Sequence, residues 1–349
     1  MVKPAAIGTL LAALLVTSAC APEKAAVRHS ASPTGAAANP VRASATPSAD
    51  PGCRLPVVQW TQMAQGAVAA GGFMQVPGGE ITPDPNSGFV QDGLRYRSTI
   101  KPYLNGGGPG SGSYDWGLAR WLPASPRTVS PDGSRYAYSS DFGFIHVVDI
   151  ATGLDRAFKA PDGPDTLMYY AREGIYFNHA WEGPPGPGLW LLDPDAGTVQ
   201  TLFSDKAVDT VGGYAAWLPD VNPADPHPVF SQYSGSNMPN RILRRDLNGG
   251  PTVSWFYRPG RSLAVVGFDQ DKHPLVVVET LSTPDSAEVW QVTAANAGRK
   301  IYSGPQVPTI MADAHGIWLA DPHGVSLFTV TSGLTKVSAL AVDIVGACR

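Results

Sequence analysis

A strand–turn–strand unit that recurs along the chain limits the folds that the chain can adopt. Its clearest copy spans residues 129–153, where Ser130-Pro131-Asp132-Gly133 and Asp149-Ile150-Ala151-Thr152-Gly153 separate short apolar and aromatic segments. Asp-Gly and Asp-x-x-x-Gly sequences supply the conformations that reverse an antiparallel ribbon. The second turn recurs at spacings of 44, 53, 47 and 36 residues, which suit a unit of four strands. The recurring positions are Asp149, Asp193, Asp246, Thr293 and Thr329.

Two strands can be recognised in each later copy of the unit, and no helical period competes with them. Val276-Val277-Val278 is a continuous apolar run, typical of a strand buried on both faces. The 38 Gly and 33 Pro amount to about one residue in five, which favours many short strands joined by tight turns. The predicted pairs are residues 174–177 with 188–193, 214–217 with 241–246, 274–278 with 288–292, and 316–319 with 325–329.

These observations predict an all-β fold, a β-propeller of six four-stranded blades. Five blades fall between about Val129 and Val337, and residues 55–122 supply most of a sixth. Residues 339–345 are expected to complete the sheet of that sixth blade. Closure by strands from both ends of the chain removes the exposed sheet edges that an open ring would present.

Residues 1–20 have the features of an export signal. Lys3 gives a positive start, residues 5–16 form an apolar core too short to span a membrane, and Thr17-Ser18-Ala19-Cys20 ends it with small residues. This end resembles the lipobox of bacterial lipoproteins, in which the cysteine becomes the acylated N-terminus and holds the protein on a membrane outside the cytoplasm. The resemblance implies lipidation of Cys20. An ordinary secretory signal with cleavage nearby is the alternative.

The remaining chain divides into a tether and a folded domain. Residues 21–50 are rich in Ala, Pro, Ser and Thr and cannot bury enough apolar surface to fold, so residues 51–349 are expected to form the propeller. With Cys20 lipidated, Cys53 and Cys348 are the two thiols left in an exported chain, and they lie at the ends of the folded region. We expect them to form a disulfide. Two free, buried cysteines are the alternative.

Composition and missing motifs narrow the function classes. The net charge is −4 with 15% charged residues, and the sequence has no cluster of Lys and Arg that could contact a phosphate backbone. Nucleic-acid binding is therefore disfavoured. The sequence has no nucleophile elbow, zinc-binding helix motif, phosphate-binding glycine loop or Cys-x-x-Cys pair. No catalytic residue, metal or cofactor is therefore assigned.

Two segments are candidates for binding. Asp220, Asn222, Asp225 and His227 place oxygen ligands and an imidazole within eight residues in the longest blade, which suits a ligand or cation loop. Their Asn-Pro and Asp-Pro pairs are also common in simple turns. The second segment holds Trp255, Tyr257 and Arg258, residue types that are enriched at binding hot spots. An outer strand with alternate rings buried is its alternative interpretation.

Two further features favour a structural role over a functional one. The glycine-rich stretch from Asn105 to Ser113 is interpreted as an insertion in the first blade, with a mobile lid as the alternative. His315 and His323 flank a predicted strand hairpin, residues 316–324, and an approach of the two rings across its turn is one interpretation. Two histidines without a third ligand do not make a zinc site, and turn surface is the preferred interpretation.

Ser130-Pro131-Asp132-Gly133, Arg135-Tyr136-Ala137-Tyr138 and the segment from Val148 to Gly153 resemble the repeat of TolB-type propellers. The resemblance implies a propeller in an extracytoplasmic setting. TolB-type proteins bind protein partners in the cell envelope. Our leading hypothesis is a lipid-anchored, noncatalytic module that binds a protein, peptide or glycan, and the alternative is a propeller hydrolase or lyase acting on sugar or cell-wall material.

Overall fold

The computed structural model describes residues 52–63, 66–87, 112–122, 124–139, 143–160, 165–179, 187–231, 236–280, 286–304 and 309–349. The chain divides into two units, Met1–Thr46 and Pro47–Arg349, and every described residue lies in the second. The predicted lipidation site Cys20, the predicted tether and most of the glycine-rich stretch fall outside the described residues. The described part is built of β-strands and short 3-10 helices.

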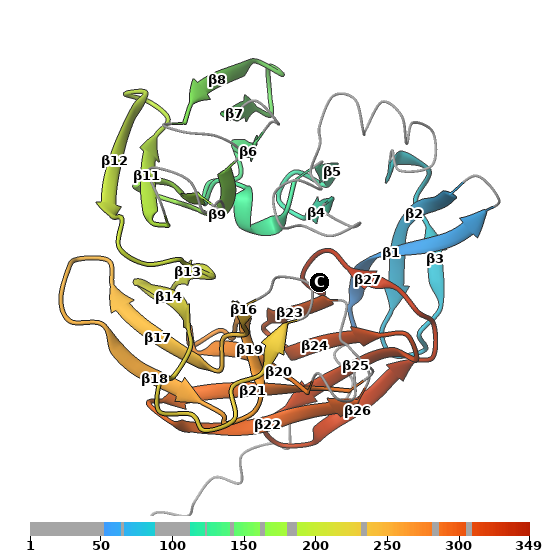
Figure 1. The fold of residues 1–349 in the computed structure, drawn as a ribbon. Coiled ribbons are helices and arrows are strands. Elements are labelled where there is room, and N and C mark those ends of the chain that lie inside the picture. The colour runs from blue at the N-terminus through green and yellow to red at the C-terminus, as the bar shows by residue number, and fades with distance from the viewer. Residues whose placement is uncertain are drawn as a thin grey trace, which may run out of the picture. The chain divides into compact units, whose positions relative to one another are not determined.

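Six blades surround an axis in the second unit, so the predicted propeller is confirmed (Figure 1). We number the blades in chain order, and each strand order below runs outward from the axis. Blade 1 is β27 (Asp343–Ile344), β1 (Arg54–Met63), β2 (Gly66–Gln75) and β3 (Ile81–Pro83). Blade 2 is β6 (Arg135–Ser139), β7 (Phe144–Asp149) and β8 (Asp155–Lys159). Blade 3 is β9 (Asp165–Ala171), β10 (Gly174–His179), β11 (Leu189–Asp193) and β12 (Thr198–Phe203).

The second half of the ring repeats the same antiparallel order. Blade 4 is β13 (Thr210–Gly212), β14 (Ala215–Asp220), β17 (Arg241–Asp246) and β18 (Val253–Tyr257). Blade 5 is β19 (Ser262–Phe268), β20 (Pro274–Glu279), β21 (Ala287–Ala294) and β22 (Ala297–Gly304). Blade 6 is β23 (Thr309–Asp313), β24 (Gly316–Asp321), β25 (Gly324–Thr329) and β26 (Gly333–Ser338). In blade 2 the innermost place is taken by a single bridge from Val129 to Tyr136.

Strands from both ends of the chain close the ring in blade 1, as predicted. The C-terminal strand β27 pairs with β1 through Val57 and Ile344, and takes the innermost place in the sheet. Cys53 and Cys348 form a disulfide with a Cα–Cα distance of 5.5 Å, which confirms their predicted pairing. The first blade is therefore assembled from segments nearly 300 residues apart.

The Ser-Pro-Asp-Gly turn before β6 is held by its own side chains. The Asp132 carboxylate accepts hydrogen bonds from the Ser130 hydroxyl at 2.6 Å and from the Ser134 backbone N–H at 3.0 Å. Gly133 has a φ of +71°, a backbone conformation that is unfavourable for residues with a Cβ atom. Asp149 fixes the second turn in the same way, accepting from the Thr152 N–H at 2.8 Å. The recurring motif is therefore a pair of side-chain-stabilised reversals.

Neighbouring blades pack face to face, which divides the hydrophobic core into clusters between them. In β20, Val276 and Val278 are buried against blade 4, whereas Leu275 points the other way and is buried against blade 6. The predicted burial of this strand on both faces is confirmed, and the strand lies second from the axis. Alternate residues of one strand thus belong to different cores.

The region between β3 and β6 holds a separate two-stranded sheet. Residues 55–122 supply most of blade 1 through β1 to β3, as predicted, and β4 (Ser113–Asp115) and β5 (Arg120–Leu122) form a hairpin outside that sheet. Aromatic packing attaches it to blade 1, with the rings of Phe73 and Tyr114 4.8 Å apart, and Trp121 donates a hydrogen bond of 2.9 Å to Asp84. This hairpin lies beside blade 1 because its large, half-buried rings pack there.

Candidate functional site

A cavity of about 1320 Å³ lies among the innermost segments of the blades. It is lined by residues of β9, β13, β19, β23 and β27 and by the short 3-10 helix η3 (Pro126–Thr128) of blade 2. Each blade therefore contributes its inner edge to one shared space. Its volume is larger than that of typical small-molecule pockets, so it has room for a sizeable ligand.

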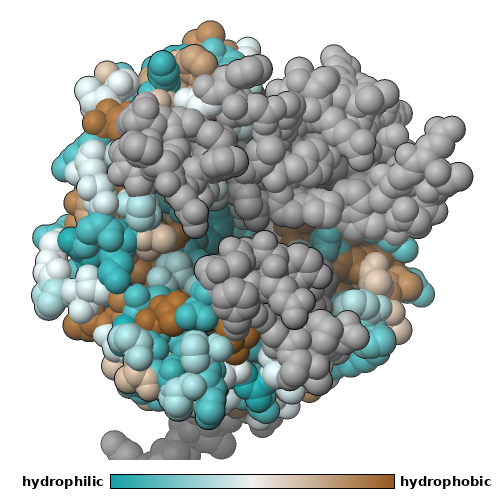
Figure 2. Space-filling model, viewed as in Figure 1, coloured by the Kyte–Doolittle hydropathy of each residue, from teal (hydrophilic) through white to brown (hydrophobic). Residues whose placement is uncertain are grey.

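Much of the cavity wall is apolar. On the face seen in Figure 2, apolar residues lie among polar ones over the described surface rather than in one continuous patch. A concave apolar space with a few polar groups is a better candidate for binding than scattered surface residues. The apolar and aromatic lining includes Tyr169, Tyr176, Val266, Phe268, Ile310 and Met311.

Arg127 brings a positive charge into this apolar space. Its Nη2 group donates to the Thr210 hydroxyl and, at 2.9 Å, to the Val211 carbonyl, and its guanidinium carbon lies 5.6 Å from the Phe268 ring centroid. Burial lowers the pKa of Arg127 to about 10. At that pKa the guanidinium remains charged at neutral pH. Among the described residues, no carboxylate lies within ion-pair distance of it.

Glycine allows the Phe268 ring to approach the neighbouring blade. A Cβ atom on Gly212 would lie 2.3 Å from the Phe268 ring, so only glycine fits there without a shift of the ring. Gly212 is the last residue of β13, and Thr210 in the same strand holds Arg127. Blades 2, 4 and 5 thus meet at Arg127 and Phe268.

Two residues at the rim of the cavity have unusual backbone conformations. Tyr214, in the turn after β13, has a φ of +60° and is 82% exposed. Lys272, in the turn after β19, has a φ of +66°. The turns touch, because a Cβ on Gly213 would lie 3.1 Å from the Lys272 carbonyl oxygen. Left-handed backbone at bulky residues is uncommon and is often found at functional sites.

An imidazole and a carboxylate lie together on another wall of the cavity. His315 Nδ1 is 3.3 Å from an Asp313 carboxylate oxygen, and that oxygen also accepts a hydrogen bond of 2.8 Å from the His315 backbone N–H. The ring nitrogen is buried, and no described residue makes a well-aligned hydrogen bond to it. This pair is the nearest feature in the cavity to an acid–base group.

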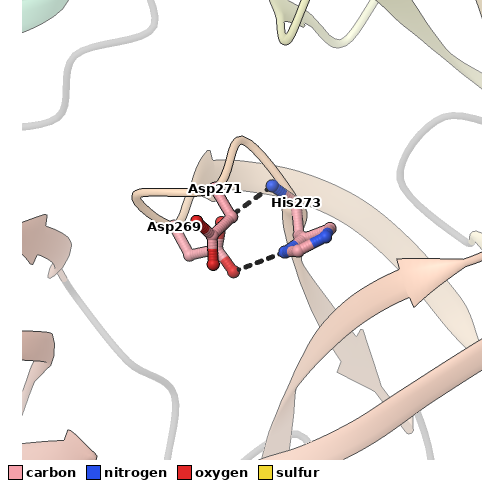
Figure 3. A group of neighbouring side chains, drawn as sticks. All are labelled: Asp269, Asp271 and His273. Atoms are coloured by element: carbon pink, nitrogen blue, oxygen red, sulfur yellow. Dashed lines mark hydrogen bonds and ion pairs between the residues drawn. The ribbon is translucent and has the colours of Figure 1, made fainter.

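Three potential metal ligands gather in the turn between β19 and β20. Side-chain atoms of Asp269, Asp271 and His273 lie within 4.8 Å of one another (Figure 3). The Asp269 carboxylate is occupied, because it accepts from the His273 N–H at 2.8 Å, from His273 Nδ1 at 2.9 Å and from the Gln291 amide. These bonds account for the cluster as a stabilised turn, with Asp271 exposed beside it.

The first predicted binding segment forms a hydrogen-bonded corner of blade 4. Asp220 is ion-paired with Arg241, and the Asp225 carboxylate accepts from the His227 N–H at 2.8 Å and from the Asn240 side chain at 2.6 Å. These hydrogen bonds hold the pKa of Asp225 below its usual value. The Asn222 N–H donates to the Asn240 side chain at 2.8 Å. The predicted residues are thus brought together around Asn240, with their carboxylates committed to protein partners.

The second predicted segment lies on β18 and meets the first. Gly260 donates a hydrogen bond of 3.2 Å to Asp225, and burial together with the Asp225 carboxylate raises the pKa of Tyr257. The Arg258 guanidinium lies 4.1 Å from the Phe256 ring centroid and 4.3 Å from that of Trp290. The Trp255 ring packs against Trp217 at 5.7 Å. Trp255 and Arg258 therefore take part in packing between blades 4 and 5.

The two histidines that flank a predicted strand do not approach each other. His315 precedes β24 and His323 follows it, so they lie at opposite ends of a six-residue strand. The His323 N–H donates to Asp321 at 2.7 Å and stabilises the next turn. The alternative in which the pair meets is wrong, because the intervening residues are extended and do not form a turn.

Sequence reasoning missed the cavity residues. Arg127, Tyr214 and Phe268 belong to three blades and are separated by dozens of residues, so no local spacing connects them. The one local signal was Gly212-Gly213-Tyr214, in which two glycines precede an aromatic residue. Such a pair is typical of close backbone approach.

Comparisons with known proteins found solved structures that are similar to this chain at low sequence identity. No protein-family model and no curated protein sequence matches the chain. An oligogalacturonate lyase in complex with manganese is similar with a TM-score of 0.42 and 14% identity, and the match covers 60% of this chain and 63% of the lyase. TolB from Acinetobacter baumannii is similar with a TM-score of 0.39 and 14% identity, and the match covers 83% of this chain and 82% of TolB. A chain of a nidogen/laminin complex is similar with a TM-score of 0.40 and 10% identity, and the match covers 84% of this chain and 98% of that chain.

These similarities do not bear on activity, and the match spans less than two thirds of the lyase. The six described sheets themselves define the class: the protein is a six-bladed β-propeller with an apolar axial cavity. Among the described residues, no helix has the length and hydropathy needed to span a membrane.

Proposed function

We propose that the protein is a lipid-anchored, extracytoplasmic β-propeller of the bacterial cell envelope that binds a protein, peptide or glycan at its axial cavity. The observation that carries this proposal is the cavity itself, which combines apolar walls with the exposed Tyr214 at its rim. Exposed aromatic rings beside a concave apolar space are typical of binding surfaces. The binding role is noncatalytic.

The disulfide supports the extracytoplasmic part of the proposal. Disulfides persist in oxidising compartments and are rare in the bacterial cytoplasm. The bond between Cys53 and Cys348 fits an exported chain. The lipobox-like sequence ending at Cys20 and the Ala, Pro, Ser and Thr composition of residues 21–50 support an anchor followed by a tether.

The proposal is tested by a pull-down from native membranes with the full-length, lipidated protein as bait. We expect Tyr214→Ala to lose the partner that the wild-type protein retains through a salt wash. Leu154→Ala is the matched control, because Leu154 is 61% exposed and does not line the cavity. Equal recovery with all three baits would contradict binding at the cavity.

Anchoring is tested separately. Cys20→Ser is expected to move the protein from the membrane fraction to the soluble extracytoplasmic fraction, because the acyl chains would be absent. Continued membrane association of this variant would contradict lipidation at Cys20. The pull-down and the fractionation address different parts of the proposal, so each can fail alone.

A propeller hydrolase or lyase acting on sugar or cell-wall material is the second candidate. The pair formed by Asp313 and His315 favours it, because an imidazole beside a carboxylate in a cavity can act as an acid or a base. Turnover of cell-wall glycans that His315→Gln abolishes would favour the enzyme. Retained partner binding without turnover would favour the binding module.

A further inference from the structure

Arg127 has hydrogen-bond donors that no described residue satisfies. Its hydrogen bonds to Thr210 and Val211 both come from Nη2. A guanidinium carries five N–H donors in a planar fork, so the donors on Nε and Nη1 have no acceptor among the described residues. Arg127 is partly exposed and lines the cavity, so an acceptor that enters the cavity can pair with these donors and with the charge.

Three acidic side chains that line the cavity have other partners. The Asp269 carboxylate is held by His273 and Gln291, and Asp313 accepts from Trp318 and from the Cys348 backbone. The Glu173 carboxylate accepts from the Tyr176 hydroxyl at 2.6 Å. Among the described residues, the charge of Arg127 is therefore left without a neutralising carboxylate.

The surroundings of Arg127 specify what an incoming anion would look like. One face of the guanidinium is covered by Phe268, and Val266, Ile310 and Met311 line the same cavity. A small hydrated anion would leave these walls unused. A molecule with an apolar body and a terminal carboxylate would satisfy the guanidinium and bury apolar surface at once.

We infer that the cavity binds an amphipathic carboxylate, whose carboxylate accepts hydrogen bonds from Nε and Nη1 of Arg127 while its apolar part packs against Phe268. The inference rests on the proposed binding function and names the chemical class of the ligand. Arginine suits this role because its fork matches the two oxygens of a carboxylate. A small organic acid and the C-terminus of a peptide share this chemistry.

The inference is tested by calorimetric titration with N-acetyl-L-phenylalanine and with its primary amide, which differ in the carboxylate. We expect the acid to bind the wild-type protein at least about tenfold more tightly than the amide, the effect of a charge-assisted hydrogen bond. Arg127→Met should abolish this preference, and Arg127→Lys should keep part of it because a point charge replaces the fork.

Arg156→Met is the matched control. Arg156 also lies over a ring, 5.5 Å from the Phe158 centroid, but it does not line the cavity. This variant should retain the wild-type preference for the acid. Thermal unfolding of Arg127→Met checks the fold, and a transition no lower than that of Arg156→Met is expected, because the substitution removes a charge that has no carboxylate partner among the described residues.

Equal affinity for acid and amide, no binding of either by the wild-type protein, or a preference retained by Arg127→Met would each overturn the inference. If the pull-down with Tyr214→Ala still lost the partner, the proposed binding function would stand without the carboxylate inference. A peptide arm, N-acetyl-Ala-Ala-Phe as acid and amide, identifies the source of the carboxylate. Tighter binding of this peptide acid than of the single amino acid supports a peptide C-terminus, and equal binding supports a small organic acid.

Discussion

The backbone N–H of Cys348 donates a hydrogen bond of 2.7 Å to the carboxylate of Asp313. Asp313 is 8% exposed and ends β23, the innermost strand of blade 6. The same oxygen accepts the indole N–H of Trp318 at 2.9 Å, and Trp318 is fully buried. One carboxylate thus joins the closing segment of the ring to the core of the adjacent blade.

Asp313→Ala should be strongly destabilising, because it leaves two buried donors without an acceptor. Each unsatisfied donor costs about 1–3 kcal/mol, so we expect the free energy of unfolding to fall by roughly 3 kcal/mol. Urea denaturation measures this loss. Asp271→Ala is the control, since Asp271 is an exposed aspartate, and its midpoint should be unchanged. Equal midpoints for the two variants would contradict the role of Asp313.

Replacing both Cys53 and Cys348 with serine should lower the free energy of unfolding. The bond closes a loop with a sequence separation of 295 residues, and in the chain-entropy model such a loop contributes about 6 kcal/mol. Urea titrations with and without a reducing agent should differ for the wild-type protein and coincide for the double variant. An intact mass with two free thiols would refute the bond.

Asp209→Asn should stabilise the protein at neutral pH. Burial raises the pKa of Asp209 from 3.8 to about 6. The folded state therefore holds a proton that the unfolded state has lost, and stability from this group falls as pH rises between those values. The gain above pH 7 is at most about 3 kcal/mol, at 1.4 kcal/mol per pKa unit.

Unfolding measured at pH 4 and pH 7.5 tests this sign. The variant and the wild-type protein should be similar at pH 4, and the variant should be more stable at pH 7.5. Its side-chain oxygen can still accept the Val265 N–H that Asp209 accepts at 3.1 Å. A variant less stable than the wild-type protein at pH 7.5 would show that the charged carboxylate is the favoured form.

Asp132→Ala should destabilise the turn before β6. The pH dependence of this effect should be opposite to that expected for Asp209. Hydrogen bonds from Ser130 and Ser134 lower the pKa of Asp132 to about 2. Its stabilising effect is present above the unfolded value of 3.8 and is lost as pH falls toward 2. Thermal unfolding should separate the variant from the wild-type protein at pH 6 and bring the two together near pH 2. A gap that persists at low pH would assign the effect to something other than the charged carboxylate.

The sequence predicted the second and third strands of the blades best. Strands such as β20 and β24 are buried on both faces and read as runs of apolar residues. The innermost strands were missed because they face the cavity and mix polar residues and glycine, as in Thr210-Val211-Gly212 of β13. Outer strands such as β12 are largely exposed and give weak patterns. Hydrophobic periodicity arises from burial, so strands that face a cavity or solvent show a weaker hydrophobic pattern in the sequence.

The candidate site was less predictable than the fold for a related reason. Ring closure could be inferred because the two cysteines mark the ends of the folded region. Arg127 and Phe268 meet only because blades 2 and 5 converge on the axis, and neither residue stands in a recognisable motif. Residues from different blades that meet at the axis of the ring have no characteristic spacing in the sequence.

The pairing of β27 with β1 also has a consequence for biosynthesis. Blades 3 to 6 are each encoded by one continuous stretch and can assemble as the chain emerges. Blade 1 cannot, because Asp343 and Ile344 of β27 are translated after the strands of the other five blades. The inner edge of β1 therefore stays unpaired until β27 has been translated, and a chain that is truncated before Asp343 cannot close the ring.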